Sequence, residues 1–563
     1  MEEIKETQEE KKSKKEHWKK FVIFFFLIAI MAVGINRYFP TRKTMDLENQ
    51  YYKIGENVDG ALIVGNQNTG MGIKREGESI YFPLEAVQTY INERFYWDGQ
   101  YILYTLPEET ITYIPGKRAY ETEAGKGYYK YIPVILEEEQ VWLEIRLIEQ
   151  YTNITWSTQD NGIWVWNCWD TELTYAQLKY DMAIRYAGDP KSPILVSGKK
   201  GDSVQVLDTS VRNWTKVQTA EGIIGYIWRG ALAGFYTETK HQDFQEPEYT
   251  SLSLGEDVVL MWHQNLYDSG LAELPAILEN RQINVIAPSW FTIADSEGQI
   301  VSRADKAYTE KAHEAGVRVW AMLDNINIEI DDTKLLSNTE SRRHLVDNVM
   351  EAAINSGIDG INIDLESIEA ENGPAFTQLI REFSVACRKA GLMLSVDNYV
   401  PITSNLYYNR QEQAEVVDYI IMMGYDEHWA GSEPGSTASY SFVKNGIVRS
   451  LQEVPEEKLI LAVPFYTRLW TIEDGVVSSK AIGMNAIPEL IAQWHRDIQW
   501  LEKEQQHYAE FRDGKITQKL WIEDADSMAW KLELAKAYNL AGVAIWKAGF
   551  GSEDIWDLEW KQK

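Results

Sequence analysis

Two kinds of hydrophobic pattern divide the chain near residue 250. From about 44 to 235, apolar residues come in short β-branched and aromatic runs, such as "YILYTL" and "GIWVWN", which Gly, Asn, Asp and Pro separate. Runs of this kind are typical of short strands joined by turns. One helical interval at 83–95, "PLEAVQTYINERF", interrupts them. The pattern predicts two small β-rich domains, at 44–175 and 176–235.

Residues 253–560 show a different pattern, in which continuous apolar runs alternate with helical stretches. Continuous runs are typical of parallel strands that are covered on both faces. We find eight of them, which fits an α/β fold of the (β/α)8 TIM barrel type. They lie at 258–265, 284–291, 317–325, 360–366, 392–399, 419–426, 459–466 and 542–550.

The fourth run, "GINIDLE" at 360–366, contains acids that packing does not explain. Its apolar residues alternate with Asn362, Asp364 and Glu366. Successive side chains on a strand point to opposite sides, so these three point into the barrel. Glu366 lies nearest the C-terminal mouth, where TIM barrels carry their active sites. Because burying unpaired carboxylates costs free energy, the pattern indicates a catalytic site.

The spacing of the two carboxylates favours acid–base chemistry. Two residues apart on one strand, Asp364 and Glu366 are expected to have Cβ atoms roughly 6–7 Å apart. Like charges at this distance raise one pKa, so that one group keeps a proton while the other is ionised. Cleavage of a glycosidic bond needs such a pair, because a proton goes to the leaving oxygen and an anion stabilises the cationic sugar.

"DGINIDLE" at 359–366 also resembles the DxxDxDxE signature of glycosyl hydrolase family 18. Asp359, Asp364 and Glu366 match it, and Asn362 replaces the usual second Asp. "MMGYDEH" at 422–428 resembles the family's Met-x-Tyr-Asp motif on strand six. The segments 458–470 and 542–550 resemble its strands seven and eight. "NIDLE" and "YDEH…PGS" resemble the spore-germination and cortex-lytic branch more than secreted chitinases. Residues 467–541 leave limited room for the family's large insertion.

The resemblance implies a retaining, substrate-assisted mechanism, in which the sugar's own 2-acetamido group is the nucleophile. Glu366 would be the general acid and then the base. Asp364 would orient the acetamido nitrogen and stabilise the oxazolinium ion, and Tyr425 would donate a hydrogen bond to the acetamido oxygen. The expected substrate-binding residues are Asp359, Asn362, Met423, Asp426 and Trp546, with Trp546 as an apolar floor under the sugar and Trp290 as a weaker stacking candidate.

This mechanism needs an N-acetyl group at carbon two, so the expected partner is an N-acetylated glycan polymer. Peptidoglycan, cleaved after N-acetylglucosamine, is the first candidate, and chitin is the alternative. Two further hypotheses are a catalytically inactive glycan-binding protein on the same barrel and a wall-attached scaffold. We expect no cofactor and no metal, because protons and the substrate's acetamide carry the chemistry.

The two upstream domains resemble accessory modules. Residues 44–175 resemble the copper amine oxidase N-terminal-like domain of exported bacterial proteins, chiefly through "IYFPLEAVQTYINERFYWDGQ". Residues 176–235 resemble a bacterial SH3 domain through "GDSVQVL", a strand around Trp214 and "GYI" at 225–227. For this second module, a wall-binding role and a spacer role both stay open.

The N-terminus predicts export. Residues 21–35 are apolar and uncharged, and six lysines precede them between 11 and 20. This asymmetry predicts a basic cytoplasmic stub at 1–20, a transmembrane signal anchor at 21–39, and a catalytic domain outside the cell membrane. The alternative is a signal peptide cleaved after residue 34, which would give a secreted protein. A net charge of −30 argues against nucleic acid as a partner.

Overall fold

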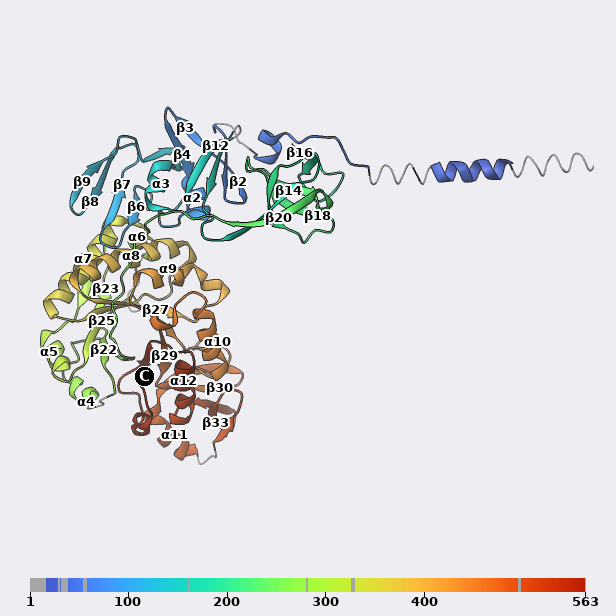
Figure 1. Ribbon diagram of the computed structural model, residues 1–563. Coiled ribbons are helices and arrows are strands. Elements are labelled where there is room, and N and C mark those ends of the chain that lie inside the picture. The colour runs from blue at the N-terminus through green and yellow to red at the C-terminus, as the bar shows by residue number, and fades with distance from the viewer. Residues whose placement is uncertain are drawn as a thin grey trace, which may run out of the picture. The chain divides into compact units, whose positions relative to one another are not determined.

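The computed structural model describes residues 17–28, 31, 39–53, 58–159, 162–279, 282–325, 330–494 and 498–561. Two compact units divide the chain. The first comprises Met1–Phe95, Pro115–Arg118 and Tyr129–Glu246, and the second comprises Tyr96–Ile114, Ala119–Tyr128 and Pro247–Lys563. Figure 1 shows both units.

Eight parallel strands form a closed barrel in the second unit. Each strand pairs with the next, and β35 pairs with β21 to close the ring. All eight predicted runs form strands, which confirms the predicted barrel. The strands are β21 (Val258–His263), β22 (Val285–Pro288), β25 (Arg318–Asp324), β26 (Gly360–Asp364), β27 (Met393–Tyr399), β28 (Tyr419–Met423), β29 (Leu459–Pro464) and β35 (Gly542–Trp546).

Helices surround these strands (Figure 1). Two of the longest end at glycines: Gly357 and Gly391 both adopt φ = 69°, a left-handed conformation that suits glycine. The helices are α4 (Leu274–Leu278), α5 (Lys306–Glu314), α6 (Asp332–Ser337), α7 (Thr339–Ser356), α8 (Gly373–Ala390), α9 (Arg410–Val416), α10 (Tyr440–Ser450) and α12 (Ala525–Ala537).

The barrel strands separate two hydrophobic cores. Ile361, Ile363 and Leu365 pack toward the helices, in the larger core. Inward residues of the other strands, among them Trp262, Trp320 and Met322, fill the barrel interior. The alternation therefore sends the polar residues of β26 inward, as expected.

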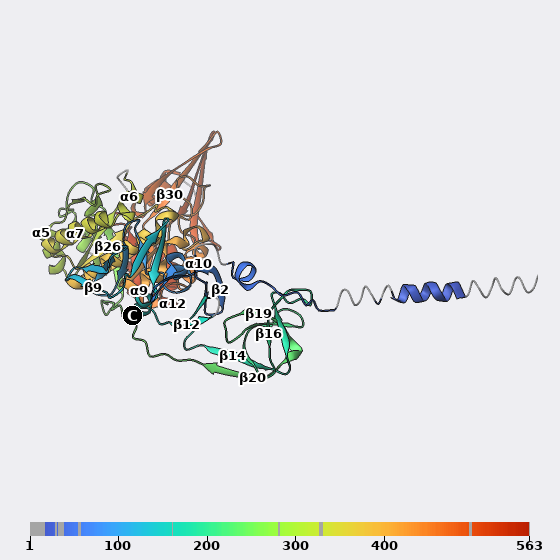
Figure 2. The ribbon, with the colours of Figure 1, turned by 90° about the horizontal axis from the view of Figure 1, so that it is seen from above.

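An insertion lies between β29 and β35. It is a five-stranded antiparallel sheet with the order β31-β30-β34-β33-β32, and it carries one helix, α11 (Ile487–Trp494). Figure 2 shows its long strands projecting from the barrel. Tight hairpin turns fit five strands into this short segment. They are β30 (Tyr466–Glu473), β31 (Val476–Gly483), β32 (Gln499–Leu501), β33 (Gln506–Asp513) and β34 (Ile516–Ile522).

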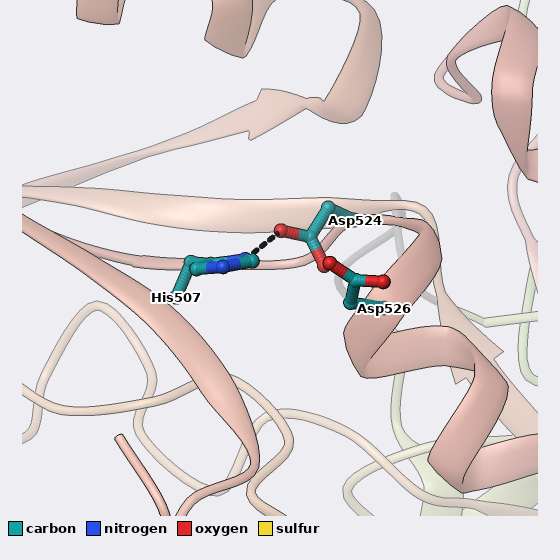
Figure 3. A group of neighbouring side chains, drawn as sticks. All are labelled: His507, Asp524 and Asp526. Carbon is teal, nitrogen blue, oxygen red and sulfur yellow. Dashed lines mark hydrogen bonds and ion pairs between the residues drawn. The ribbon is translucent and has the colours of Figure 1, made fainter. Parts of the chain in front are cut away.

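Three side chains join the insertion to the barrel helix α12. Asp524 begins the helix, where its Oδ1 accepts a hydrogen bond of 2.9 Å from the backbone N–H of Ser527. Its Oδ2 lies 2.7 Å from Nδ1 of His507 on β33. Asp526 lies beside both residues, with the three groups within 4.8 Å of one another (Figure 3). Helix capping and the His507 contact engage both oxygens of Asp524, and this fixes the junction.

A second antiparallel sheet belongs to the barrel unit, although its sequence lies within 44–175. Gln378 of α8 donates a 2.9 Å hydrogen bond to Thr105, and Arg343 of α7 donates one of 3.0 Å to Thr112. The sheet consists of β5 (Tyr96–Trp97), β6 (Ile102–Thr105), β7 (Thr110–Tyr113), β8 (Ala119–Thr122) and β9 (Gly125–Tyr128).

The first unit is β-rich, as predicted. It contains two short helices, α2 (Leu84–Tyr90) and α3 (Ile145–Tyr151), and two four-stranded sheets. One sheet consists of β1 (Ala61–Val64), β2 (Gln67–Gly72), β12 (Thr155–Gln159) and β13 (Gly162–Trp166). The other consists of β3 (Lys74–Glu76), β4 (Ser79–Pro83), β10 (Val134–Glu137) and β11 (Gln140–Glu144). A seven-stranded sheet follows: β14 (Glu172–Leu178), β15 (Met182–Arg185), β16 (Ile194–Gly198), β17 (Ser203–Asp208), β18 (Trp214–Gln218), β19 (Ile224–Trp228) and β20 (Leu232–Thr239). The two family resemblances of this unit stay predictions.

The predicted membrane anchor is wrong. Among the described residues, no helix has both the length and the apolar character that a bilayer crossing requires. Near the N-terminus, residues 17–28 are helical. The single-pass location and the membrane as a partner are therefore corrected. Residues 1–16 of the predicted stub and the cleavage site at 32–34 lie outside the described residues.

Candidate active site

Three aspartates lie side by side at the C-terminal end of the barrel. Asp324 of β25 pairs with Asp364 of β26. Ile363 of β26 pairs with Val396 of β27, which places Asp364 beside Asp397. Neighbouring strands are about 4.8 Å apart, and all three side chains point inward and are buried. The register therefore concentrates negative charge at one point, next to Glu366.

Asp364 lies at the centre of this cluster. It is 4% exposed, and its Oδ1 has no hydrogen-bond partner within the described residues. Burial raises the pKa of Asp364 well above its ordinary value, and the negative charges of Asp397, Glu366 and Asp324 raise it further. The site therefore favours a proton on or next to this carboxylate.

Asn362, the departure from the family signature, is fully buried and fully engaged. Its Oδ1 accepts a 2.8 Å hydrogen bond from Nε1 of Trp262. Its Nδ2 donates to Oγ of Ser395 at 3.0 Å and to Oδ1 of Asp397 at 2.8 Å. Asn362 thus orients Asp397.

Glu366 follows β26 and is half-buried. Asn325 binds its main chain: Asn325 Oδ1 accepts from the Glu366 N–H at 2.9 Å, and Asn325 Nδ2 donates to the Glu366 carbonyl at 3.0 Å. The hydroxyl of Tyr399 donates to Oε2 of Glu366 at 2.6 Å. Burial raises the pKa of Glu366, the Tyr399 hydrogen bond lowers it, and the charge of Asp426 raises it. A raised pKa suits a general acid.

Tyr425 follows β28 and packs against both barrel cores. Its ring centroid lies 6.2 Å from that of Tyr466. Burial raises the pKa of Tyr425 well above its ordinary value, and the charges of Asp364, Asp397 and Glu366 act in the same direction. The hydroxyl therefore stays protonated and can donate a hydrogen bond.

Met423 and Asp426 flank Tyr425. Met423 is buried at the end of β28. Asp426 is exposed and adopts φ = 57°. Its Oδ1 accepts a 2.6 Å hydrogen bond from the Tyr466 hydroxyl and lies 3.5 Å from Nη2 of Arg468. The first residues of the insertion strand β30 therefore hold Asp426 in place.

Trp546 ends β35 and is partly exposed. Its ring meets that of Trp262 edge to face, with centroids 5.7 Å apart. Trp262 in turn is bonded to Asn362, so the aromatic surface adjoins the acidic cluster. Trp290, the weaker stacking candidate, is fully buried and donates from Nε1 to the Ser269 carbonyl, so no ring face is available to a sugar.

Asp359 lies at the opposite end of the barrel from the other predicted residues. It precedes the first residue of β26, about 16 Å from Asp364 at strand spacing. Its Oδ2 accepts from the Val319 N–H at 2.8 Å and lies 2.8 Å from Nε2 of His313. The structure gives Asp359 a role in joining strands and does not bring it to the site.

Sequence reasoning missed several residues of the site. The strand "LMLSVDNY" had a signal, because Ser395, Asp397 and Tyr399 are spaced two residues apart and therefore share the inward face. Asp324 and Asn325 also end a predicted strand.

Comparisons with known proteins found a matching family model and several similar proteins. Residues 281–551 match the model of the glycosyl hydrolases family 18. The glycosylase YvbX of Bacillus subtilis is 27% identical over 300 residues, which cover 49% of this chain and 83% of that protein. The cortical fragment-lytic enzyme of the same species is 25% identical over 264 residues, 45% of this chain and 61% of that one. A chitinase structure from Chromobacterium violaceum covers 54% of this chain and 97% of its own, with 19% identity and a TM-score of 0.49.

Proposed function

We propose that this glycoside hydrolase, whose barrel is a family 18 domain, cleaves β-1,4 bonds after N-acetylglucosamine in peptidoglycan. The observation that carries the proposal is the placement of Glu366 above a cluster of buried aspartates at the mouth of the barrel. Similarity to a cortical fragment-lytic enzyme supports a wall glycan as the substrate.

Glu366 acts first, as a general acid. Its proton passes to the glycosidic oxygen, and the bond from this oxygen to the anomeric carbon breaks. The carbonyl oxygen of the sugar's 2-acetamido group bonds to the anomeric carbon and forms an oxazolinium ion. The raised pKa of Glu366 supports this role, because the proton is retained until the leaving group needs it.

Asp364 and Tyr425 serve the acetamido group. Asp364 accepts a hydrogen bond from its N–H and stabilises the positive charge of the oxazolinium ion. Tyr425 donates a hydrogen bond to the acetamido oxygen as it becomes the nucleophile. The protonated state of the Tyr425 hydroxyl, favoured by burial, supports the donor role.

Water completes the reaction. Glu366, now a carboxylate, takes a proton from a water molecule that attacks the anomeric carbon. The bond to the acetamido oxygen breaks, and the acetamide forms again. Two displacements at the same carbon retain its configuration, and Glu366 recovers its proton for the next cycle.

Trp429 supports a polymeric substrate. This residue lies in the loop between β28 and α10 and is 56% exposed. A Cβ atom on Gly431 would lie 2.4 Å from its ring, so the glycine allows the ring to lie against the main chain. The Trp429 N–H donates to Oγ of Ser432 at 3.0 Å. We propose that this exposed ring, three residues after Asp426 in the sequence, stacks on a further sugar of the chain.

Two alternatives differ in substrate or in activity. Chitin also supplies N-acetylglucosamine, so the same chemistry serves a chitinase. A glycan-binding protein without activity would not need the acid, and the presence of Glu366 with Asp364 and Tyr425 supports an active enzyme.

The test compares the full-length protein with its Glu366→Gln variant, which keeps the shape of the side chain and removes the acid proton. Each is incubated with purified peptidoglycan and with chitin oligomers, and mass spectrometry identifies the products. New fragments with reducing N-acetylglucosamine ends from peptidoglycan, absent with the variant, are the expected result. Reducing N-acetylmuramic acid ends, or cleavage of chitin alone, would contradict the assigned bond. Binding without cleavage would identify a glycan-binding protein.

A further inference from the structure

Oδ1 of Asp364 and Oδ2 of Asp397 are buried at the centre of the site. Among the described residues, neither of these carboxylate oxygens has a hydrogen-bond partner. Both residues face into the barrel from adjacent strands, at neighbouring register positions, and both are at most 4% exposed. A buried polar atom without a partner is unfavourable, and two adjacent buried anions are more unfavourable still. One proton held between the two oxygens would remove both costs.

We propose that Asp397 is a positioning residue that shares one proton with Asp364, so that the pair carries a single negative charge. This inference rests on the proposed function, because it assigns the state in which Asp364 meets the oxazolinium ion. The proton is carried by Oδ2 of Asp397 and donated to Oδ1 of Asp364. Asp364 is then the anion of the pair, aligned by a hydrogen bond.

Asn362 selects Asp397 for this role. Its Nδ2 donates to Oδ1 of Asp397, which leaves Oδ2 as the oxygen that can carry a proton. Because both donors of Asn362 go to Ser395 and Asp397, Asn362 has none left for Asp364. Where the family signature has a second Asp on the same strand, this chain supplies the acid from the next strand.

The other groups that face Asp364 are Asp324 from β25, Glu366 beyond β26 and Tyr425 beyond β28. Glu366 is committed to the leaving group. Among the charges that raise the pKa of Asp364, that of Asp397 contributes most. During turnover the shared proton stays in the pair: it moves toward Asp397 as positive charge develops on the sugar and relaxes when the acetamide forms again. No proton is consumed.

The first test measures the proton without using activity. Infrared difference spectra at pH 7 compare full-length Glu366→Gln protein with the same protein carrying Asp397→Asn, since Glu366→Gln removes the signal of the general acid. We expect the carbonyl band of one protonated carboxylic acid to disappear with Asp397→Asn and to persist with Asp324→Asn. Persistence in the Asp397 variant, or loss with Asp324→Asn instead, would overturn the proposal.

The second test is a rescue. Asp397→Asn keeps an acceptor for Asn362 but cannot hold an acidic proton, and we expect kcat to fall roughly 100-fold with KM little changed. Adding Asn362→Asp moves the acid back to β26 while Trp262 and Ser395 keep their partners, and should restore kcat at least about 10-fold. A purely structural role predicts wild-type kcat for Asp397→Asn and no gain from the second change. Thermal unfolding of each variant checks folding, and the infrared result stands even if no polymer is cleaved.

Discussion

The hydroxyl of Tyr399 donates a 2.6 Å hydrogen bond to Oε2 of Glu366, the residue assigned as general acid. This bond stabilises the carboxylate form and therefore lowers the pKa of Glu366 against the effect of burial. Because Glu366 must be protonated to act, activity should fall as the pH rises through its pKa. Tyr399→Phe removes the donor, so the pKa of Glu366 rises further and the alkaline limb of kcat/KM should move to higher pH.

Tyr407→Phe is the matched control for this change. The Tyr407 hydroxyl donates to the Ile368 carbonyl at 2.8 Å, in the same region but without contact to Glu366. The pH profile of this control should match that of the wild type. A shift of the Tyr399 variant to lower pH would remove Glu366 from the role of acid.

Tyr425→Phe tests the donor to the acetamido oxygen. The hydrogen bond strengthens as that oxygen attacks, so its loss should lower kcat by about 10²–10³-fold, the usual effect of removing one such donor. Tyr419→Phe, at the other end of β28, removes a hydroxyl that accepts from the Leu254 N–H at 3.0 Å and should leave kcat unchanged. Equal kcat values for the two variants would contradict the role of Tyr425.

Asp364→Asn should lower activity and raise stability. The pKa of Asp364 is raised in the folded state, so the folded protein binds this proton more tightly than the unfolded chain. That contribution to stability is present at low pH and is lost as the pH rises through the raised pKa. At neutral pH the variant should gain about 0.5–2 kcal/mol in the free energy of unfolding. Urea unfolding at several pH values measures the gain, which should shrink toward acid pH. A variant less stable than the wild type at every pH would contradict this reading.

Trp429→Ala tests the proposed stacking surface. The loss of one aromatic contact of about 0.5–1.5 kcal/mol should raise KM for the polymer roughly 2- to 10-fold, with little effect on kcat. Trp530 of α12 is also exposed, and Trp530→Ala should leave KM unchanged. A similar KM for both variants would show that Trp429 does not contact the glycan.

The sequence was sufficient to predict the barrel fold, because the barrel strands are buried on both faces and appear in the sequence as continuous apolar runs. It also predicted an inward acidic face with Asp364 and Glu366, because these residues alternate with apolar ones. Asp324 and Asp397 were missed because each is a single acid in an apolar strand, and their meeting depends on strand register. Register between strands far apart in sequence is set by tertiary packing.

The placement of Asp359 at the substrate failed for a geometric reason. Asp359 and Glu366 are close in the sequence of the signature, but a strand runs from one end of the barrel to the other and separates them.

Asn325 anchors the general acid Glu366 by two hydrogen bonds to its main chain, and not to its carboxyl group. Neither of these two bonds involves an atom that gains or loses a proton during turnover. The carboxyl group can therefore lose and regain its proton in every cycle while the main chain of Glu366 stays fixed to the neighbouring strand. Asn325 therefore fixes the position of the general acid without taking part in its proton transfer.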